Sequence, residues 1–275
     1  RQPSILVTPT GRLIVSFDLG GEGVKSIEGH KSSRAGGSRF GQGKIFISDD
    51  NGQKWTFVQN FPFWHARLFT IGNSIYLIGH AGDICIMKSE DNGESWSDTY
   101  FLTHGEKWHS SACNVLFSNG NVYLAMEQRC RLNEVTGWDV AGLSPTLFRA
   151  CVEDNLCLAS SWSRSEKFIY KEVFDGAKLD FFGIPFYDCE TNKPKEIATG
   201  INNAPLGWLE ANVVKFVDKD HIWHTDLKEV FHLFLRAHTG GVNYAHLFKI
   251  EIQDDQSMIP SSVSYTHLTL PTSDL

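Results

Sequence analysis

The sequence predicts an all-β protein built from repeated four-stranded antiparallel sheets. Its 275 residues include 24 Gly, 19 Phe, 8 Trp and 7 Tyr but only 3 Met, a composition that suits many short strands joined by tight turns. With 41% hydrophobic and 21% charged residues, the chain can bury a sizeable core. Two patterns that recur along the chain define the repeating unit.

The first pattern is an apolar strand, a turn rich in Gly, Asn or Asp, and a second apolar strand. Short apolar runs bounded by such turn residues are typical of β-strands. Four copies occur, at residues 4–17, 68–78, 114–124 and 212–235. Each copy predicts two neighbouring strands.

The second pattern is the octapeptide S-x-D-x-G-x-x-W, found at residues 48–55 and 89–96 after apolar strands at 44–47 and 83–87. Its Asp carboxylate can accept backbone N–H groups of the same turn, its Gly can adopt a positive φ, and its Trp can pack back on the sheet. A third, altered copy ends at Trp162. Joining one strand pair to one octapeptide hairpin gives a unit of about 45 to 65 residues, the size of one β-propeller blade.

The chain is predicted to form one domain over residues 1–262. Residues 164–204 have a weaker pattern, which we interpret as outer strands with long loops, and no low-complexity linker divides the chain. Residues 263–275 break the repeat and resemble a translated vector tail, so we expect them to be non-native; a genuine last strand is the alternative. About four to five blades are therefore expected.

Charge and cysteine content exclude several classes of function. A net charge of −7 argues against nucleic acid as a partner, and no apolar run of membrane-spanning length is present. The six cysteines form no C-x-x-C pair, so a zinc site has little support, and free thiols and disulfides both remain open. We also expect no metal and no cofactor.

The octapeptides resemble the Asp boxes of the sialidase superfamily, the bacterial-neuraminidase-repeat propellers. The opening segment at residues 1–13 is similar to the sialidase F-R-I-P segment, with Gln2 in place of Ile, and the resemblance implies that Arg1 holds a substrate carboxylate. The segments at 63–69, 108–112, 125–127 and 207–212 look more like a sialidase-related branch that degrades polysaccharides. The family further implies six or seven blades in the complete propeller and a secreted or periplasmic protein.

Superposing the four strand pairs places a set of polar residues at one end of the sheets. The residues directly before the first strands are Arg1, His65, His109 and Glu210, and those directly after the second strands are Asp18, His80, Glu127 and His238, with Arg236 nearby. Strand ends around a propeller channel are where ligands bind, and titratable side chains are what a catalytic site requires. As catalytic residues we predict His109, Glu127, Glu210, His65 and Asp18; as substrate-binding residues we predict Arg1, Arg236, His80 and His238.

The function predicted from these residues is a sialidase-like hydrolase that removes a terminal acidic or deoxy sugar from a glycan, acting as a monomer. Glu127 and Glu210 would supply acid, base or charge stabilisation, and His109 would assist proton transfer. One alternative is a polysaccharide lyase in which His109 or His65 removes a proton next to a uronate carboxylate. Another is a glycan-binding propeller without catalysis.

Three further residue roles stay open at the level of sequence. The tryptophans Trp64, Trp108 and Trp208 could stack on sugars or pack between blades. A nucleophilic role for Tyr244 competes with a place in a strand or core. A metal site from His65, His109 and Glu127 has no supporting ligand spacing.

Overall fold

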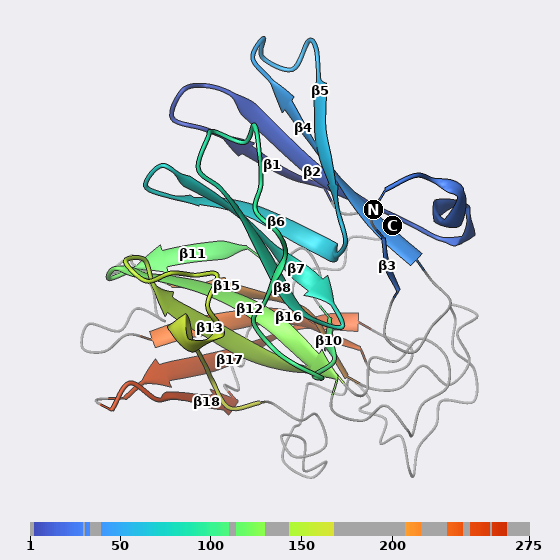
Figure 1. The fold of residues 1–275 in the computed structure, drawn as a ribbon. Helices are drawn as coiled ribbons and strands as arrows, with labels where there is room; N and C mark the ends of the chain where they lie inside the picture. The colour runs from blue at the N-terminus through green and yellow to red at the C-terminus, as the bar shows by residue number, and fades with distance from the viewer. Residues whose placement is uncertain are drawn as a thin grey trace. The chain divides into compact units, whose positions relative to one another are not determined.

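The computed structural model describes residues 3–29, 31–33, 40–109, 114–129, 143–167, 207–215, 230–238, 243–253 and 255–262. These residues form antiparallel β-sheets and two short 3-10 helices, with no α-helix among them (Figure 1). The chain divides into two compact units, one of residues 1–122 with 149–163 and the other of residues 123–148 with 164–275. We describe each unit by itself.

The first sheet belongs to the first unit and has the strand order β1-β2-β4-β3, with β5 paired to β4. Its strands are β1 (Ser4–Val7), β2 (Leu13–Gly20), β3 (Ser32–Ser33), β4 (Phe40–Ser48) and β5 (Thr56–Phe61), and the 3-10 helix η1 (Glu22–Ser26) follows β2. Alternate residues of β2 are buried, which is the pattern of a strand with one face on a core. The opposite face is apolar as well, and its Ile5, Val7 and Phe57 are exposed.

The second sheet, β6-β7-β8-β9, packs on the buried face of the first sheet (Figure 1). Its strands are β6 (Trp64–Ile71), β7 (Ser74–Ala81), β8 (Asp83–Ser89) and β9 (Tyr100–Phe101). Fully buried Ile14, Ile45 and Phe61 of the first sheet meet Leu77 of the second in one hydrophobic cluster. The backbone N–H of Leu68 also donates to Ser4 Oγ at 3.0 Å, so β1 and β6 are joined directly.

The two octapeptides form turns with the same hydrogen bonds. In the first, Ser48 Oγ accepts from the Gly52 N–H at 2.9 Å, and Asp50 Oδ1 accepts from the Lys54 N–H at 2.8 Å. In the second, Ser89 Oγ accepts from the Gly93 N–H and Asp91 Oδ1 from the Ser95 N–H, both at 2.9 Å. The φ angles of the two glycines are +84° and +87°, the left-handed conformation that the sequence pattern predicts.

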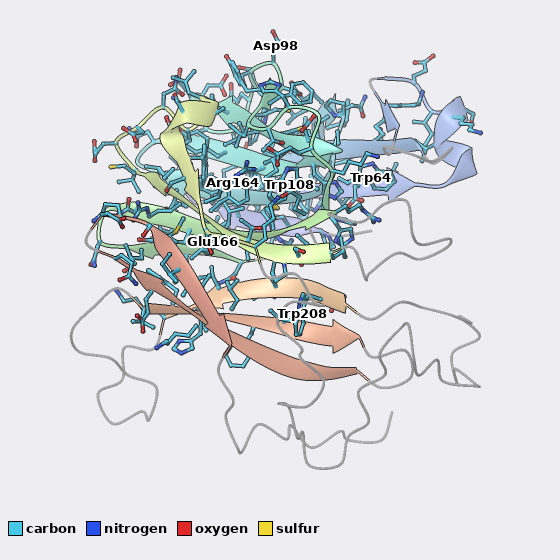
Figure 2. The ribbon with its side chains drawn as sticks, turned by 90° about the horizontal axis from the view of Figure 1, so that it is seen from below. Trp64, Asp98, Trp108, Arg164, Glu166 and Trp208 are labelled. Carbon is cyan, nitrogen blue, oxygen red and sulfur yellow. The ribbon has the colours of Figure 1, made fainter. Side chains whose placement is uncertain are left out.

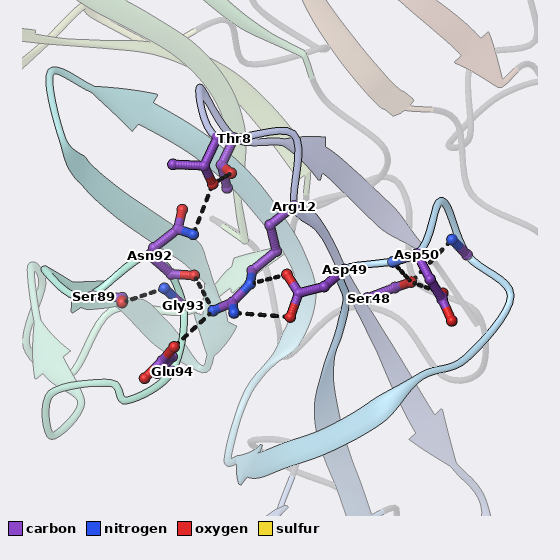
Figure 3. A network of polar contacts seen from close by, with 11 residues as sticks. Thr8, Arg12, Ser48, Asp49, Asp50, Ser89, Asn92, Gly93 and Glu94 are labelled. Carbon is purple, nitrogen blue, oxygen red and sulfur yellow. Dashed lines mark hydrogen bonds and ion pairs between the residues drawn. The ribbon is translucent and has the colours of Figure 1, made fainter.

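Arg12 joins the two octapeptide turns (Figure 3). Its Nε and a terminal nitrogen donate to both carboxylate oxygens of Asp49, at 2.6 and 2.9 Å. Its other terminal nitrogen donates at 3.2 Å to the Asn92 carbonyl and to Glu94 Oε1. A planar guanidinium can make all these bonds at once, so Arg12 couples the outer ends of the first and second sheets.

The third sheet has the order β10-β12-β13-β14, with β11 also paired to β12. It comprises β10 (Trp108–His109), β11 (Val115–Ser118), β12 (Asn121–Arg129), β13 (Leu143–Cys151) and β14 (Trp162–Arg164), with the 3-10 helix η2 (Ala159–Ser161) before β14. The division between the units falls within β12, β13 and β14. The altered octapeptide lies here, and it is closed differently from the other two, because Trp162 Nε1 donates to the Leu156 carbonyl at 2.9 Å.

The fourth sheet, β15-β16-β17-β18, belongs to the second unit. Its strands are β15 (Gly207–Val214), β16 (Val230–His238), β17 (Asn243–Ile252) and β18 (Met258–Ser262). Trp208, Val213 and Phe231 are fully buried. The Phe231 ring also lies 4.2 Å, centroid to centroid, from Tyr123 of β12 in the same unit.

The prediction of an all-β chain of repeated antiparallel sheets is confirmed for the described residues, although two of their four sheets have five strands rather than four. Each strand pair found in the sequence lies in its own sheet, and three of the four pairs begin their sheet, whereas β10 begins the third sheet. Most of residues 164–204, and the whole of the proposed tail at 263–275, lie outside the described residues. Within the part of the chain that the structure describes, no helix is long and apolar enough to cross a membrane.

Candidate functional site

The nine predicted site residues differ in how far the structure describes them. Arg1 lies outside the described residues, and Arg236 and His238 are described only as backbone at the end of β16. Asp18, His65, His80 and His109 fall in the first unit, and Glu127 and Glu210 in the second. Four of these six residues therefore belong to the first unit and two to the second.

Three imidazoles gather in the first unit. His80 Nε2 lies 3.2 Å from His65 Nδ1, a hydrogen bond in which one ring donates and the other accepts. The ring centroid of His109 is 5.3 Å from that of His65 and 5.8 Å from that of His80. His80 is buried, whereas His65 and His109 are half-buried. The three side chains that the sequence places at one strand end thus lie together.

His65 reaches this cluster through a β-bulge in β6. The sequence pattern predicts His65 just before its strand, but His65 lies within β6, where the register shifts between Trp64 and Arg67. His65 has a φ of +50°. Gly79 allows the bulge, because a Cβ there would lie 2.4 Å from the Trp64 carbonyl oxygen.

Asp18 lies inside β2 rather than after it, paired with Gly43 of β4. Only 1% of its surface is exposed, and it is on the face of the first sheet that packs toward the second. A carboxylate this deeply buried needs polar partners, because transfer of a charge out of water is unfavourable. Asp18 belongs to the first unit, as do the three histidines.

In the second unit, the structure connects Glu127 to the segment that carries Glu210. Glu127 lies within β12 and is 1% exposed, and its Oε1 accepts from the backbone N–H of Ala211 at 2.9 Å. Glu210, the residue before Ala211, is exposed and has a φ of +62°. Glu127 is thereby bound to the backbone of the residue next to Glu210, 84 positions away in the sequence, and the sequence pattern did not single out the donor Ala211.

The three candidate sugar-stacking tryptophans are buried. Trp64, Trp108 and Trp208 are 5%, 2% and 0% exposed (Figure 2). A ring that stacks on a sugar must present an open face, so these indoles act as packing residues that support the polar groups beside them. The side chain of Tyr244 lies outside the described part of the chain.

Metal ligation and thiol chemistry gain no support from the described residues. Among them, no group of three His, Cys, Asp or Glu side chains is arranged to hold a metal ion. The described cysteines Cys85, Cys151 and Cys157 are free thiols. Burial raises the pKa of the Cys85 thiol to about 12, so this cysteine stays protonated and unreactive near neutral pH.

The fold places the chain among all-β proteins made of repeated antiparallel sheets. No protein-family model matches the sequence. No curated protein matches it either.

Among solved structures, the chain is similar to alpha-L-arabinofuranosidase from Lactobacillus brevis, with 12% identity, a TM-score of 0.51, and 96% of this chain and 77% of that chain covered. It is also similar to a protein of unknown function from Dyadobacter fermentans, with 13% identity, a TM-score of 0.50, and 96% and 68% covered. An endo-arabinase from Bacteroides thetaiotaomicron gives 11% identity, a TM-score of 0.48, and 96% and 80% covered. At these identities the likeness concerns the fold alone.

Proposed function

We propose that this protein is a glycoside hydrolase whose two working carboxylates are Glu127 and Glu210. The observation that carries the proposal is the hydrogen bond from the Ala211 N–H to Glu127 Oε1, because it ties one carboxylate to the backbone beside the other. Glycoside hydrolysis commonly uses a pair of carboxyl groups that flank the bond to be broken. Glu127 is buried and Glu210 is exposed, so the two carboxyl groups have different surroundings.

The reaction assigned to this pair is hydrolysis of a terminal glycosidic bond. One carboxyl group protonates the leaving oxygen as the bond between that oxygen and the anomeric carbon breaks. The other carboxylate takes a proton from a water molecule, whose hydroxyl oxygen bonds to the anomeric carbon. The products are a free sugar and a shortened glycan, and no cofactor is consumed.

Two sugar classes are candidates. The resemblance of the octapeptides to Asp boxes, together with Arg1, favours a sialidase-like propeller of six or seven blades that acts on an acidic or deoxy sugar. The fold similarity to alpha-L-arabinofuranosidase favours a terminal pentofuranose instead. In both cases the partner is a glycan and the chain acts as a monomer, and the resemblance to sialidases also favours a secreted or periplasmic protein.

A polysaccharide lyase is the second candidate function, and the cluster of His65, His80 and His109 favours it. Imidazoles can accept a proton near neutral pH, and the hydrogen bond between His65 and His80 would fix the tautomer of the base. In that reaction a histidine removes the proton next to the uronate carboxylate while the bond to the leaving oxygen breaks. The product is an unsaturated sugar that absorbs in the near ultraviolet.

The test is a panel of aryl α-L-arabinofuranosides, sialosides and rhamnosides, together with uronate-containing polysaccharides. We expect Glu127→Gln and Glu210→Gln each to lower kcat on the cleaved substrate by on the order of 10² to 10⁴-fold. Glu90→Gln serves as the matched control, because Glu90 is exposed and pairs with Lys88 at the outer turn.

The possible results separate the three functions. Near-ultraviolet absorbing products that disappear in His65→Ala and His109→Ala would establish the lyase. Glycan binding without cleavage of any substrate would leave a binding protein. Unchanged turnover in both Glu variants would refute the hydrolase assignment.

A further inference from the structure

The segment of β15 that carries Glu210 is a β-bulge. Leu209 pairs with Arg236 and Asn212 with Phe234, so Glu210 and Ala211 together stand opposite one residue of β16. A bulge of this kind changes the direction of backbone and side-chain groups relative to a regular strand, in which the backbone groups would pair with the neighbouring strand. Here the first bulge residue has a positive φ and the second donates its N–H away from β16, to Glu127.

The same bulge occurs in the first unit. His65 and Ala66 stand opposite one residue of β7, and His65 also has a positive φ. In both units the sequence at the bulge is a polar residue followed by Ala, and the polar residue belongs to a candidate site. Non-glycine residues adopt a positive φ rarely, and such residues concentrate at functional sites.

From this geometry we infer that the Glu210–Ala211 bulge sets the roles of the two carboxylates, with Ala211 as a positioning residue. This inference rests on the proposed hydrolase function. Glu127, buried and bound to the Ala211 N–H, is held in one orientation by this hydrogen bond and is the group assigned to accept the proton of the attacking water. Glu210, exposed on the bulge, is assigned the proton transfer to the leaving oxygen.

The inference predicts that the residue at position 210 acts in two ways, through its carboxyl group and through its backbone. Glu210→Gln and Glu210→Gly remove the acid but keep the bulge, because Gln matches Glu in shape and Gly adopts a positive φ freely. Glu210→Val removes the acid and also opposes the bulge, because a β-branched residue strongly disfavours a positive φ. Only Glu210→Val should therefore displace the Ala211 N–H from Glu127.

Aryl glycosides with different leaving groups distinguish the two effects. A dinitrophenolate leaves without protonation, so Glu210→Gln and Glu210→Gly should lower turnover of the dinitrophenyl glycoside far less than turnover of a glycoside with a poorly leaving group. On a glycoside with a poorly leaving alkyl group the same variants should lose on the order of 10²-fold. Glu210→Val should lose turnover on both substrates. Equal dinitrophenyl turnover in Glu210→Val and Glu210→Gly would overturn the inference.

A second measurement needs no activity and covers the case in which Glu210→Val does not fold. Amide hydrogen exchange at Ala211 should be slow in the wild-type chain and faster by on the order of tenfold or more in Glu127→Ala, with Ala66 as the internal control. Unchanged exchange at Ala211 would refute its role as a positioning residue. If the wild-type chain cleaves no glycoside but shows this exchange effect, the proposed function is refuted. The hydrogen bond from Ala211 to Glu127 would still be established by the exchange data.

Discussion

His65 and Glu210 hold backbone conformations that L-residues rarely adopt, with φ angles of +50° and +62°. A left-handed conformation at a non-glycine residue costs about 1 to 2 kcal/mol. It persists only where the surrounding structure enforces it. Around His65 that enforcement comes from β7, whose Gly79 leaves the space into which the bulge of β6 projects.

Gly79→Ala therefore tests the bulge of the first unit. The new Cβ would lie 2.4 Å from the Trp64 carbonyl oxygen and 2.7 Å from Phe63 Cδ2, and the first of these is a backbone atom that cannot rotate away. We expect the free energy of unfolding to fall by about 1 to 3 kcal/mol in urea denaturation. Gly23→Ala is the control, since a Cβ there meets nothing within 4 Å. Equal stability of the two variants would contradict the close contact.

At the level of residues, the sequence predicted the site only in part. Polar side chains at strand ends were recognisable, and three of the four histidines predicted for the site lie in one cluster. The bulges were not recognisable, because a positive φ at His or Glu leaves no mark in composition. Gly79 inside an apolar strand was the available signal, since such a glycine often marks a bulge or a close backbone approach.

Among the elements, the octapeptide turns show how far a short motif determines local structure. The roles of Asp and Gly followed from the sequence pattern, because both act within the turn. The role of Arg12 did not, because it joins turns that are 37 and 82 residues away. Contacts at that sequence separation depend on how two sheets pack, which a local pattern does not contain.

The carboxylates of the two octapeptide turns also predict that the folded protein loses some of its stability in acid. The hydrogen bond from the Lys54 N–H holds the pKa of Asp50 below its usual value, with Ser48 contributing. Burial acts to raise the pKa of Asp91, but hydrogen bonds from Ser95 and Ser89 lower it overall. A depressed folded-state pKa stabilises the fold above the unfolded-state pKa of about 4, and this stabilisation is lost as pH falls through the folded value.

Asp50→Asn should consequently lower Tm at pH 7, and the difference from wild type should shrink as the pH is taken from about 5 to about 2. Differential scanning calorimetry across this pH range provides the measurement. The Asn carbonyl can still accept the Lys54 N–H, so the comparison isolates the charge. A Tm difference that stays constant with pH would show that the carboxylate charge has no part in the turn.

For the whole molecule, the sequence predicted the repeat of sheets but not their grouping. Each strand pair recognised in the sequence lies in its own sheet, because apolar runs and turns are local signals. The division into two units is not local, since it passes through β12, β13 and β14. The histidine cluster belongs to the first unit, and Glu127 and Glu210 belong to the second.

The prediction that residues 1–262 form one domain can be tested by unfolding. Val122 and Tyr123 are neighbours in the continuous strand β12 but belong to different units, so neither unit can unfold without disrupting a strand of the other. We therefore expect one cooperative transition in urea, seen alike by tryptophan fluorescence and by circular dichroism. Phe61→Ala in the first unit and Phe231→Ala in the second, both at fully buried rings, should each lower the stability of that single transition by about 3 to 5 kcal/mol. Two transitions, each moved by only one of the variants, would instead establish two independent domains.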